Sequence, residues 1–220
     1  MESNAIIEEY LSFLHYKEYP CIGAKAALSK EQIRYMVADN MACPKDDTSI
    51  LKFLYEFIDE YRNSEQIYYS AAILFKDPEI NNEEKFDELL WQRLQALGDL
   101  DIQNYSYDTR VSADPNSPDF SFSLKEEAFF IAGLHPASSR PARRFNYPAM
   151  VFNPHAQFEK MRETDLYEKV KNIIRHRDIS YSGSINPMMN DYGDSSEASQ
   201  YSGRNYDGTW KCPLRTRNVK

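Results

Sequence analysis

The sequence predicts an α+β fold, with an antiparallel sheet of about four strands, flanking helices and a long irregular C-terminal wrap. Apolar residues recur at helical spacing through most of the first hundred positions. Strict alternation then marks a hairpin between positions 120 and 134, and positions 181–220 combine turn-forming residues with scattered aromatics. A chain of 220 residues suits one domain, which we place over positions 1–220.

The N-terminal part, positions 1–100, is predicted to be helical with one strand. Helices are expected over 4–18, from about position 30, over 47–61 and over 82–98. The second of these depends on Ser29 and Gln32, which have the spacing of a capping box. The apolar run over 67–75 is short and is followed by Pro78, so it predicts the strand.

The central part, positions 120–155, is predicted to hold the remaining strands and a loop that carries the site. Positions 120–124 alternate between aromatic or aliphatic residues and serine, and positions 125–127 turn the chain back into 128–134 as an antiparallel hairpin. A further strand is expected over 149–152. Helices follow from Pro154 through Arg162 and over 165–177, before the irregular tail at 181–220.

Composition limits the classes of function. The net charge is −8, with −13 on positions 1–134 and +5 on positions 135–220, which argues against a nucleic-acid-binding protein. Three cysteines without a close pair indicate neither a disulfide framework nor a zinc site. The N-terminus does not look like a signal peptide, and no apolar run is long enough to cross a bilayer. We therefore expect a cytoplasmic protein with no membrane partner.

The strongest site signal is a histidine at the end of a predicted strand. His135 is followed within a loop by Arg140, Arg143 and Arg144. A neutral imidazole can bind a metal or heme iron, carry a proton or serve a structural role. Guanidinium groups bind carboxylates and phosphates, so the same cluster suits heme propionates or an anionic substrate. The pattern alone does not choose between these.

Two other residues are alternative iron ligands. His155 follows Asn153 and Pro154 at a predicted helix start. If the strand before it runs antiparallel to the strand that ends at His135, the two histidines lie at opposite ends of the sheet and cannot share one metal. Cys212 precedes Pro213, and a cysteine in such a position can be a heme thiolate or a buried, inert thiol.

Charged residues of the tail complete the predicted site. Glu197 and Asp191 are candidates for pairing with a cationic group of a substrate. Arg204 is a further candidate for binding an anionic cofactor group. No glycine pattern here corresponds to a phosphate-binding or dinucleotide-binding loop.

Several short motifs together resemble the YqcI/YcgG family. The most specific are Gly133-Leu-His-Pro136 and Val151-Phe-Asn-Pro-His155. Others lie at 19–24, 120–123, 139–140, 143–145, 157–159, 186–187, 200–204 and 210–213, so the resemblance covers nearly the whole chain. The family includes heme-dependent N-hydroxylases of guanidine-bearing amino acids. One departure is at 124–127, where this chain lacks an expected glycine pair in the hairpin.

The resemblance implies a heme b cofactor and oxidation of a guanidine or related nitrogen. It suggests His135 as the axial ligand, with His155 and Cys212 as alternatives, and the arginines as partners of the heme propionates. A guanidino substrate and an electron donor or peroxide are the implied small-molecule partners. The alternative of another class is a non-catalytic heme- or anion-binding protein, either a sensor or a carrier. A third is a heme-free enzyme that binds a phosphorylated or carboxylated ligand through the arginines.

Overall fold

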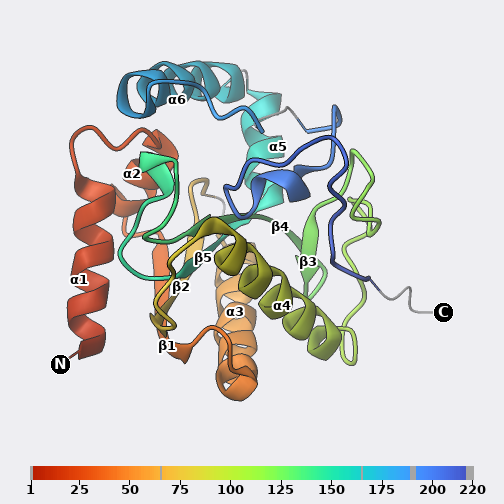
Figure 1. The fold of residues 1–220 in the computed structure, drawn as a ribbon. Helices are drawn as coiled ribbons and strands as arrows, with labels where there is room; N and C mark the ends of the chain where they lie inside the picture. Colours follow the sequence, from red (N-terminus) through yellow and green to blue (C-terminus); the bar gives the residue numbers. More distant parts are fainter. Residues whose placement is uncertain (1, 65, 165, 189–191, 217–220) are drawn as a thin grey trace.

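The computed structural model describes residues 2–64, 66–164, 166–188 and 192–216, and one five-stranded sheet lies at its centre (Figure 1). The strands are β1 (Ile33–Asn40), β2 (Ser70–Asp77), β3 (Phe122–Leu124), β4 (Glu127–Leu134) and β5 (Ala149–Pro154). Their order across the sheet is β1-β2-β5-β4-β3. β1 and β2 are parallel, whereas the other neighbouring pairs are antiparallel. The α+β prediction is confirmed, with an additional strand and one parallel pair.

Helices cover both faces of the sheet (Figure 1). Ile73 and Phe75 of β2 pack against α3 (Asp47–Arg62) and α4 (Glu83–Asp101). The alternate residues Ala72 and Leu74 face the core formed with α1 (Glu2–His15) and α2 (Ile22–Ser29). Successive side chains of a strand point to opposite faces, so a strand covered on both faces needs a continuous apolar run, which residues 71–75 of β2 supply.

The helix predicted from position 30 is wrong. Helix α2 ends at Ser29, and residues 33–40 form β1, whose Ile33 pairs with Ser70 of β2. The Ser29 hydroxyl donates to the carbonyl of Ala26, so it closes the preceding helix instead of starting a new one. Pairing with β2 supplies the backbone hydrogen bonds that the capping signal alone would assign to a helix.

The predicted β3–β4 hairpin is confirmed. Leu124 pairs with Glu127, and the two residues between them have positive φ, 49° at Lys125 and 57° at Glu126. This is the backbone conformation of a tight two-residue hairpin turn. Lys125 therefore takes the left-handed conformation without a glycine, and the departure noted at 124–127 leaves the hairpin intact.

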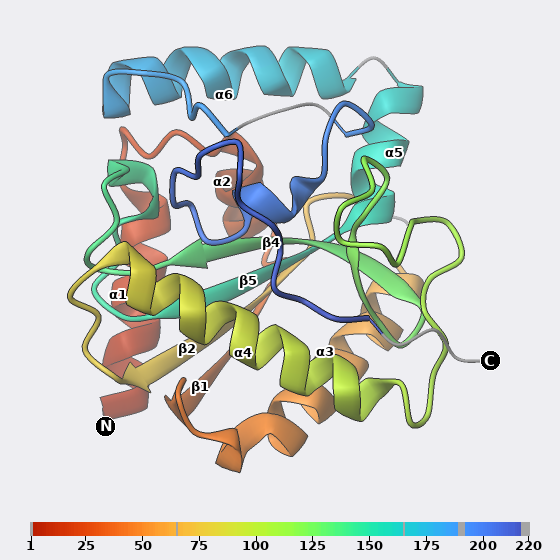
Figure 2. The same cartoon turned by 45° about the vertical axis from the view of Figure 1, so that its right-hand side comes forward.

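The last two helices, α5 (His155–Glu163) and α6 (Leu166–Ser182), follow β5, and α6 runs across the top of the molecule (Figure 2). The described part of the tail then returns over α4 and β4. The amide of Gly133 donates to the carbonyl of Tyr201, and the Tyr201 ring stacks 5.8 Å from Trp91. The described part of the tail thus wraps against α4 and β4. No helix in the described part of the chain is long and apolar enough to cross a membrane.

Candidate functional site at the end of strand β4

The antiparallel pairing of β4 with β5 sets the positions of the two central histidines. Leu134 pairs with Ala149 at one end, and Phe129 pairs with Pro154 at the other. His135 therefore leaves the sheet at one end and His155 at the opposite end, as the sequence predicted. The two imidazoles cannot bind the same metal ion. The described residues also contain no group of three or more histidine, cysteine, aspartate or glutamate side chains able to hold a metal.

His135 is fully buried, and neither of its ring nitrogens has a hydrogen-bond partner among the described residues. Its ring stacks on Phe86 of α4, with centroids 4.2 Å apart and planes 20° from parallel. Burial, with a smaller contribution from the charge of Arg143, lowers the pKa of His135 to about 4. The imidazole is thus neutral at physiological pH, so one ring nitrogen has a free lone pair. Buried polar atoms are almost always satisfied in folded proteins, which makes this ring exceptional.

Gly133 leaves the space in which the Phe86 ring stacks on His135. A Cβ at this position would lie 2.5 Å from Cε1 of Phe86 and 2.9 Å from Cδ1 of Leu90, closer than any real side chain. Only a glycine allows α4 to approach β4 this closely. The imidazole orientation is therefore set by a helix more than forty residues away in the sequence.

The Arg143 guanidinium connects the site loop to the tail. It donates to the carbonyls of Gly133 at 3.0 Å, Tyr201 at 3.2 Å and Gln200 at 3.1 Å. The backbone amide of His135 in turn donates to the carbonyl of Arg143. Burial lowers the pKa of Arg143, and its guanidinium N–H groups are satisfied by the three backbone carbonyls. Arg143 therefore fixes the backbone on both sides of His135.

Arg140 and Arg144 also bind protein groups. The Arg140 guanidinium pairs with Asp178 of α6 at 2.5 Å, with both side chains about 9% exposed, and donates to the carbonyl of Ser184. Arg144 donates to the carbonyls of Ser138 at 2.9 Å and Ser139 at 3.4 Å. A propionate or other anion at this loop would have to compete with these acceptors. Anion binding by the three arginines stays a prediction.

Arg204 contacts two acidic residues of α4. Its guanidinium contacts Glu84 at 3.0 Å and Asp87 at 3.8 Å. Asp87 also accepts hydrogen bonds from the Trp91 indole, at 2.9 Å, and from the Tyr206 hydroxyl. These contacts fasten the tail to α4, and they place Arg204 in an ion-pair network of its own.

Glu197 is buried beneath the tail. Its Oε1 accepts the hydroxyls of Ser121 at 2.7 Å and Tyr201 at 2.6 Å. Burial outweighs these two bonds and raises its pKa to about 7. A role in binding a cationic substrate would require the tail to move. Asp191, the other acidic candidate, lies outside the described residues.

His155 is also buried but has partners. Its Nε2 lies 3.1 Å from Oε1 of Glu159, and its ring is 4.4 Å from that of Tyr192. Its Nδ1 has no partner. Burial lowers its pKa, Glu159 opposes this shift, and Arg162 adds to it. The His155 ring is therefore oriented by its own helix, because Glu159 is one turn further along α5.

Cys212 is half-buried against the core that includes α4. Burial raises the pKa of its thiol to about 12. The thiolate, which is the form that binds iron, is therefore strongly disfavoured in this environment. Of the two histidine candidates, His135 alone has both ring nitrogens buried without a partner among the described residues.

The sequence did not indicate which residues pack around His135. Phe86 lies in the helix expected over 82–98, and Tyr201 lies in the motif at 200–204. Neither position carries a local signal, because both contacts come from distant parts of the chain. One available sign was Gly133, since a glycine within a strand pattern often marks a close approach of another backbone or side chain.

Comparison with known proteins identifies a family and a curated relative. A family model described as the YqcI/YcgG family matches residues 10–215. The chain is similar to the "Uncharacterized protein YqcI" of Bacillus subtilis (strain 168), with 25% identity over 193 residues. That alignment covers 84% of this chain and 75% of the relative. No solved structure matches.

Proposed function

The chain belongs to the YqcI/YcgG family, and from this premise we propose that it is a heme-dependent oxygenase. Its reaction would be N-hydroxylation of a guanidine-bearing amino acid or a related small molecule. The proposed activity rests on the resemblance of the central sequence motifs to those of known N-hydroxylases. The observation that carries the proposal is the unpartnered, neutral imidazole of His135.

The donor chemistry of His135 fits a heme iron. Axial ligation requires an imidazole lone pair, and a pKa of about 4 leaves the ring deprotonated at any physiological pH. A bound iron would also satisfy one of the two buried nitrogens that have no hydrogen-bond partner in the described part of the chain. The arginines fit less well, because Arg140, Arg143 and Arg144 already donate to protein oxygens.

The chain would supply ligation, orientation and exclusion of water. A heme supplies activation of oxygen or peroxide when bound. Activation of oxygen would also require an electron donor. Phe86 fixes the plane of the His135 ring, and Arg143 fixes the strand end and the tail. The tail backbone at Tyr201, whose carbonyl accepts from the amide of Gly133, lies against this end of β4 and would help to exclude water there.

An absorption spectrum of the purified protein tests the proposal. After expression with adequate heme we expect a Soret band, which His135→Ala should remove or weaken strongly while the matched surface change His15→Ala leaves it intact. The ferrous–CO spectrum should lack the red-shifted band of a thiolate ligand. Absence of a Soret band in the unmodified protein would contradict the proposal.

Turnover separates the oxygenase from a heme-binding sensor or carrier. The oxygenase should convert a guanidine-bearing amino acid to its N-hydroxy product with reductant and oxygen, or with peroxide. A carrier or sensor should show the Soret band without product. Because the arginines have protein partners, the structure gives no separate support to a heme-free anion site.

A further inference from the structure

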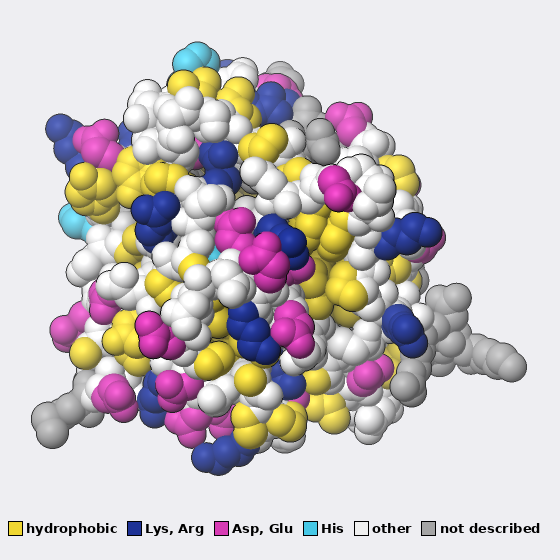
Figure 3. Space-filling view, viewed as in Figure 1, with side chains coloured by type: hydrophobic (Ala, Val, Ile, Leu, Met, Phe, Trp, Pro, Cys, Tyr) yellow, Lys and Arg dark blue, Asp and Glu magenta, His cyan; other side chains and the backbone are white. Residues whose placement is uncertain are grey.

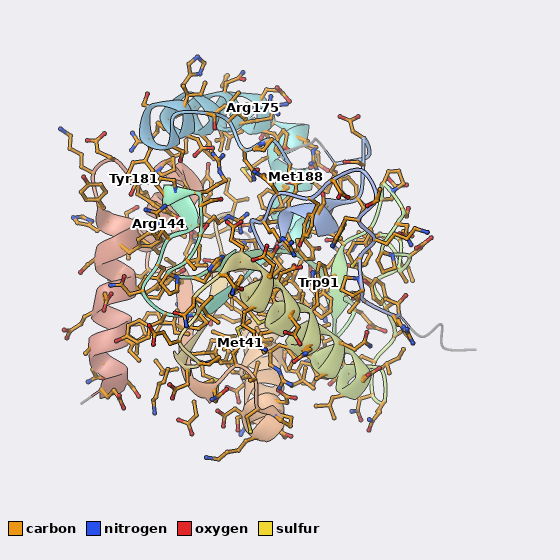
Figure 4. All side chains as sticks on the ribbon, in the orientation of Figure 1. Met41, Trp91, Arg144, Arg175, Tyr181 and Met188 are labelled. Carbon is orange, nitrogen blue, oxygen red and sulfur yellow. The ribbon has the colours of Figure 1, made fainter. Side chains whose placement is uncertain are left out.

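The tail segment 196–204 covers β4 through contacts that are buried. The amide of Gly133 donates to the carbonyl of Tyr201 at 2.7 Å, and the Tyr201 hydroxyl accepts from the amide of Phe122 at 3.1 Å. The Tyr201 ring stacks on Trp91, which projects from α4 toward the tail (Figure 4). Because Gly133 lies just before the strand end, the segment reaches the place where His135 leaves the sheet.

A buried carboxylate joins this segment to the sheet. Glu197 is only 5% exposed, and its Oε1 accepts hydroxyls from both sides, that of Tyr201 in the tail at 2.6 Å and that of Ser121 before β3 at 2.7 Å. Both donors are fully buried. Hydroxyl groups replace only part of the hydration that an ionised carboxylate has in water, so this environment favours the protonated form.

The charged and titratable groups around Glu197 come from α5, the loop before β3 and the tail. Arg162 of α5 lowers the pKa of Glu197 through its charge, but its guanidinium forms an ion pair with Glu159. Three phenols have pKa values that the Glu197 charge helps to raise, so they stay neutral near pH 7: Tyr107, Tyr192 and Tyr201. Burial outweighs Arg162 and the two hydroxyls, and it raises the pKa of Glu197 to about 7. Next to these phenols and this guanidinium, Glu197 is the group that changes charge near neutral pH.

The direction of the pH effect follows from the tighter proton binding of the closed segment. Opening would return the Glu197 carboxyl to water and to its usual pKa of 4.5. Closure is therefore fully favoured below pH 4.5 and is progressively lost as the pH rises to 7. Between pH 5 and 7.5 the ratio of open to closed molecules should rise about 50-fold.

The remaining contacts of the segment do not replace this one. The ion pair of Arg204 with Glu84 also joins the tail to α4, but both side chains are partly exposed, and such pairs contribute little. Figure 3 shows basic and acidic side chains together at the surface near the centre of this face, where the tail crosses the first turns of α4. Arg143 donates to the carbonyls of Gln200 and Tyr201, and these hydrogen bonds would break on opening.

We propose that segment 196–204 is a pH-dependent cover over the end of β4, closed while the Glu197 carboxyl is protonated and opened by its ionisation. Opening frees the amide of Gly133 and the guanidinium of Arg143, so it uncovers the strand end that leads to His135. The inference holds whether or not the protein binds heme.

Hydrogen exchange of single amides, followed by NMR on the full chain without heme, tests the proposal. The Gly133 amide donates to the tail, so its exchange rate relative to that of an unstructured peptide at the same pH reports opening. This protection factor should fall about 50-fold from pH 5 to pH 7.5. The amide of Ala132, a residue that pairs with Val151 of β5, should keep its protection.

Three variants make the test specific. Glu197→Gln keeps an acceptor for both hydroxyls but cannot ionise, so the protection of Gly133 should be the same at both pH values. Glu8→Gln, an exposed change on α1, is the matched control and should retain the 50-fold fall. Ser121→Ala removes a hydroxyl that lowers the pKa of Glu197, so the fall should extend to higher pH.

Two results would overturn the proposal. One is a Gly133 protection factor that does not depend on pH, or that depends on it equally in Glu197→Gln. The other is a parallel loss of protection at Ala132, which would mean that the sheet opens and not the tail alone. Neither result bears on the Soret band, so this inference and the heme proposal can fail independently.

Discussion

The two ends of the β4–β5 pair each carry a buried histidine, but their surroundings differ. His135 has no partner for either ring nitrogen and is held by a stacked phenylalanine. His155 has Glu159 on one nitrogen and an aromatic neighbour from the tail. Burial lowers the pKa of both rings. Burial is therefore common to both rings, and the lack of a partner among the described residues is what distinguishes His135 as the candidate ligand.

The largest expected effect is on the free energy of unfolding at acidic pH. The pKa of His135 falls from its usual 6.5 to about 4 on folding, so the unfolded chain binds a proton first as the pH falls. The free energy of unfolding should therefore decrease between pH 6.5 and 4, by about 3 kcal/mol from this residue. Denaturant unfolding across this range measures it, and His135→Leu should remove the part of the decrease that His135 contributes, while the part from His155 stays.

Glu197 has the opposite effect on the free energy of unfolding, which it increases as the pH falls. It is present in both the unmodified protein and His135→Leu. Its pKa rises to about 7 on folding, so its burial penalty disappears as the pH falls from 7 towards its usual 4.5. Subtracting the His135→Leu curve from that of the unmodified protein cancels this contribution. Parallel curves for the two proteins would contradict a depressed pKa at His135.

Gly133→Ala should cause the next largest change. The added methyl group meets Phe86 and Leu90 at under 3 Å in a packed core, and overpacking of this kind costs about 2–3 kcal/mol. Urea unfolding measures the loss. Gly208→Ala is the matched control, because a Cβ there meets no atom within 4 Å. Equal stability of the two variants would show that α4 does not need this close approach.

His135→Leu should stabilise the heme-free protein at pH 7. Leucine has a similar volume and removes two buried nitrogens that make no hydrogen bond, which should increase the free energy of unfolding by about 1–2 kcal/mol. Thermal and denaturant unfolding of both proteins measure the gain, with His15→Leu as an exposed control. A loss of stability would mean that the imidazole has a protein partner after all.

Glu159→Gln should have the smallest effect. It removes the charge that faces His155 and Arg162, but Glu159 is 48% exposed, and such ion pairs contribute about 0.5 kcal/mol. The same unfolding measurement applies, and addition of salt should reduce the difference further. A change as large as that of Gly133→Ala would show that the two ends of the strand pair are equally constrained.

Local sequence patterns predicted much of the fold. Alternation at 120–124 and the turn after Leu124 were sufficient for the hairpin, because its partners are adjacent in the chain. The β1 strand was missed, since its hydrogen bonds go to β2, with Ile33 opposite Ser70. The nearby Ser29–Gln32 signal favoured a helix that the sheet pairing overrides.

The positions of the two histidines were predicted for the same reason, whereas the role of His135 stays a prediction. A strand end followed by arginines singled out His135 as a candidate, and antiparallel pairing separated it from His155. The partners of the arginines could not be predicted, because Asp178 and the tail carbonyls reach the loop only after folding. The same holds for Phe86, whose contact with His135 depends on the packing of α4 against Gly133.

Heme titration of the protein prepared without cofactor tests the central claim most directly, with the unmodified chain and His135→Leu compared side by side. The variant is expected to be at least as stable as the unmodified protein, so a failure to bind could not be ascribed to unfolding. The account predicts a saturable Soret band for the unmodified protein and its loss in His135→Leu, with His155→Leu retaining it. An identical, saturable band in His135→Leu would show that another residue binds the iron.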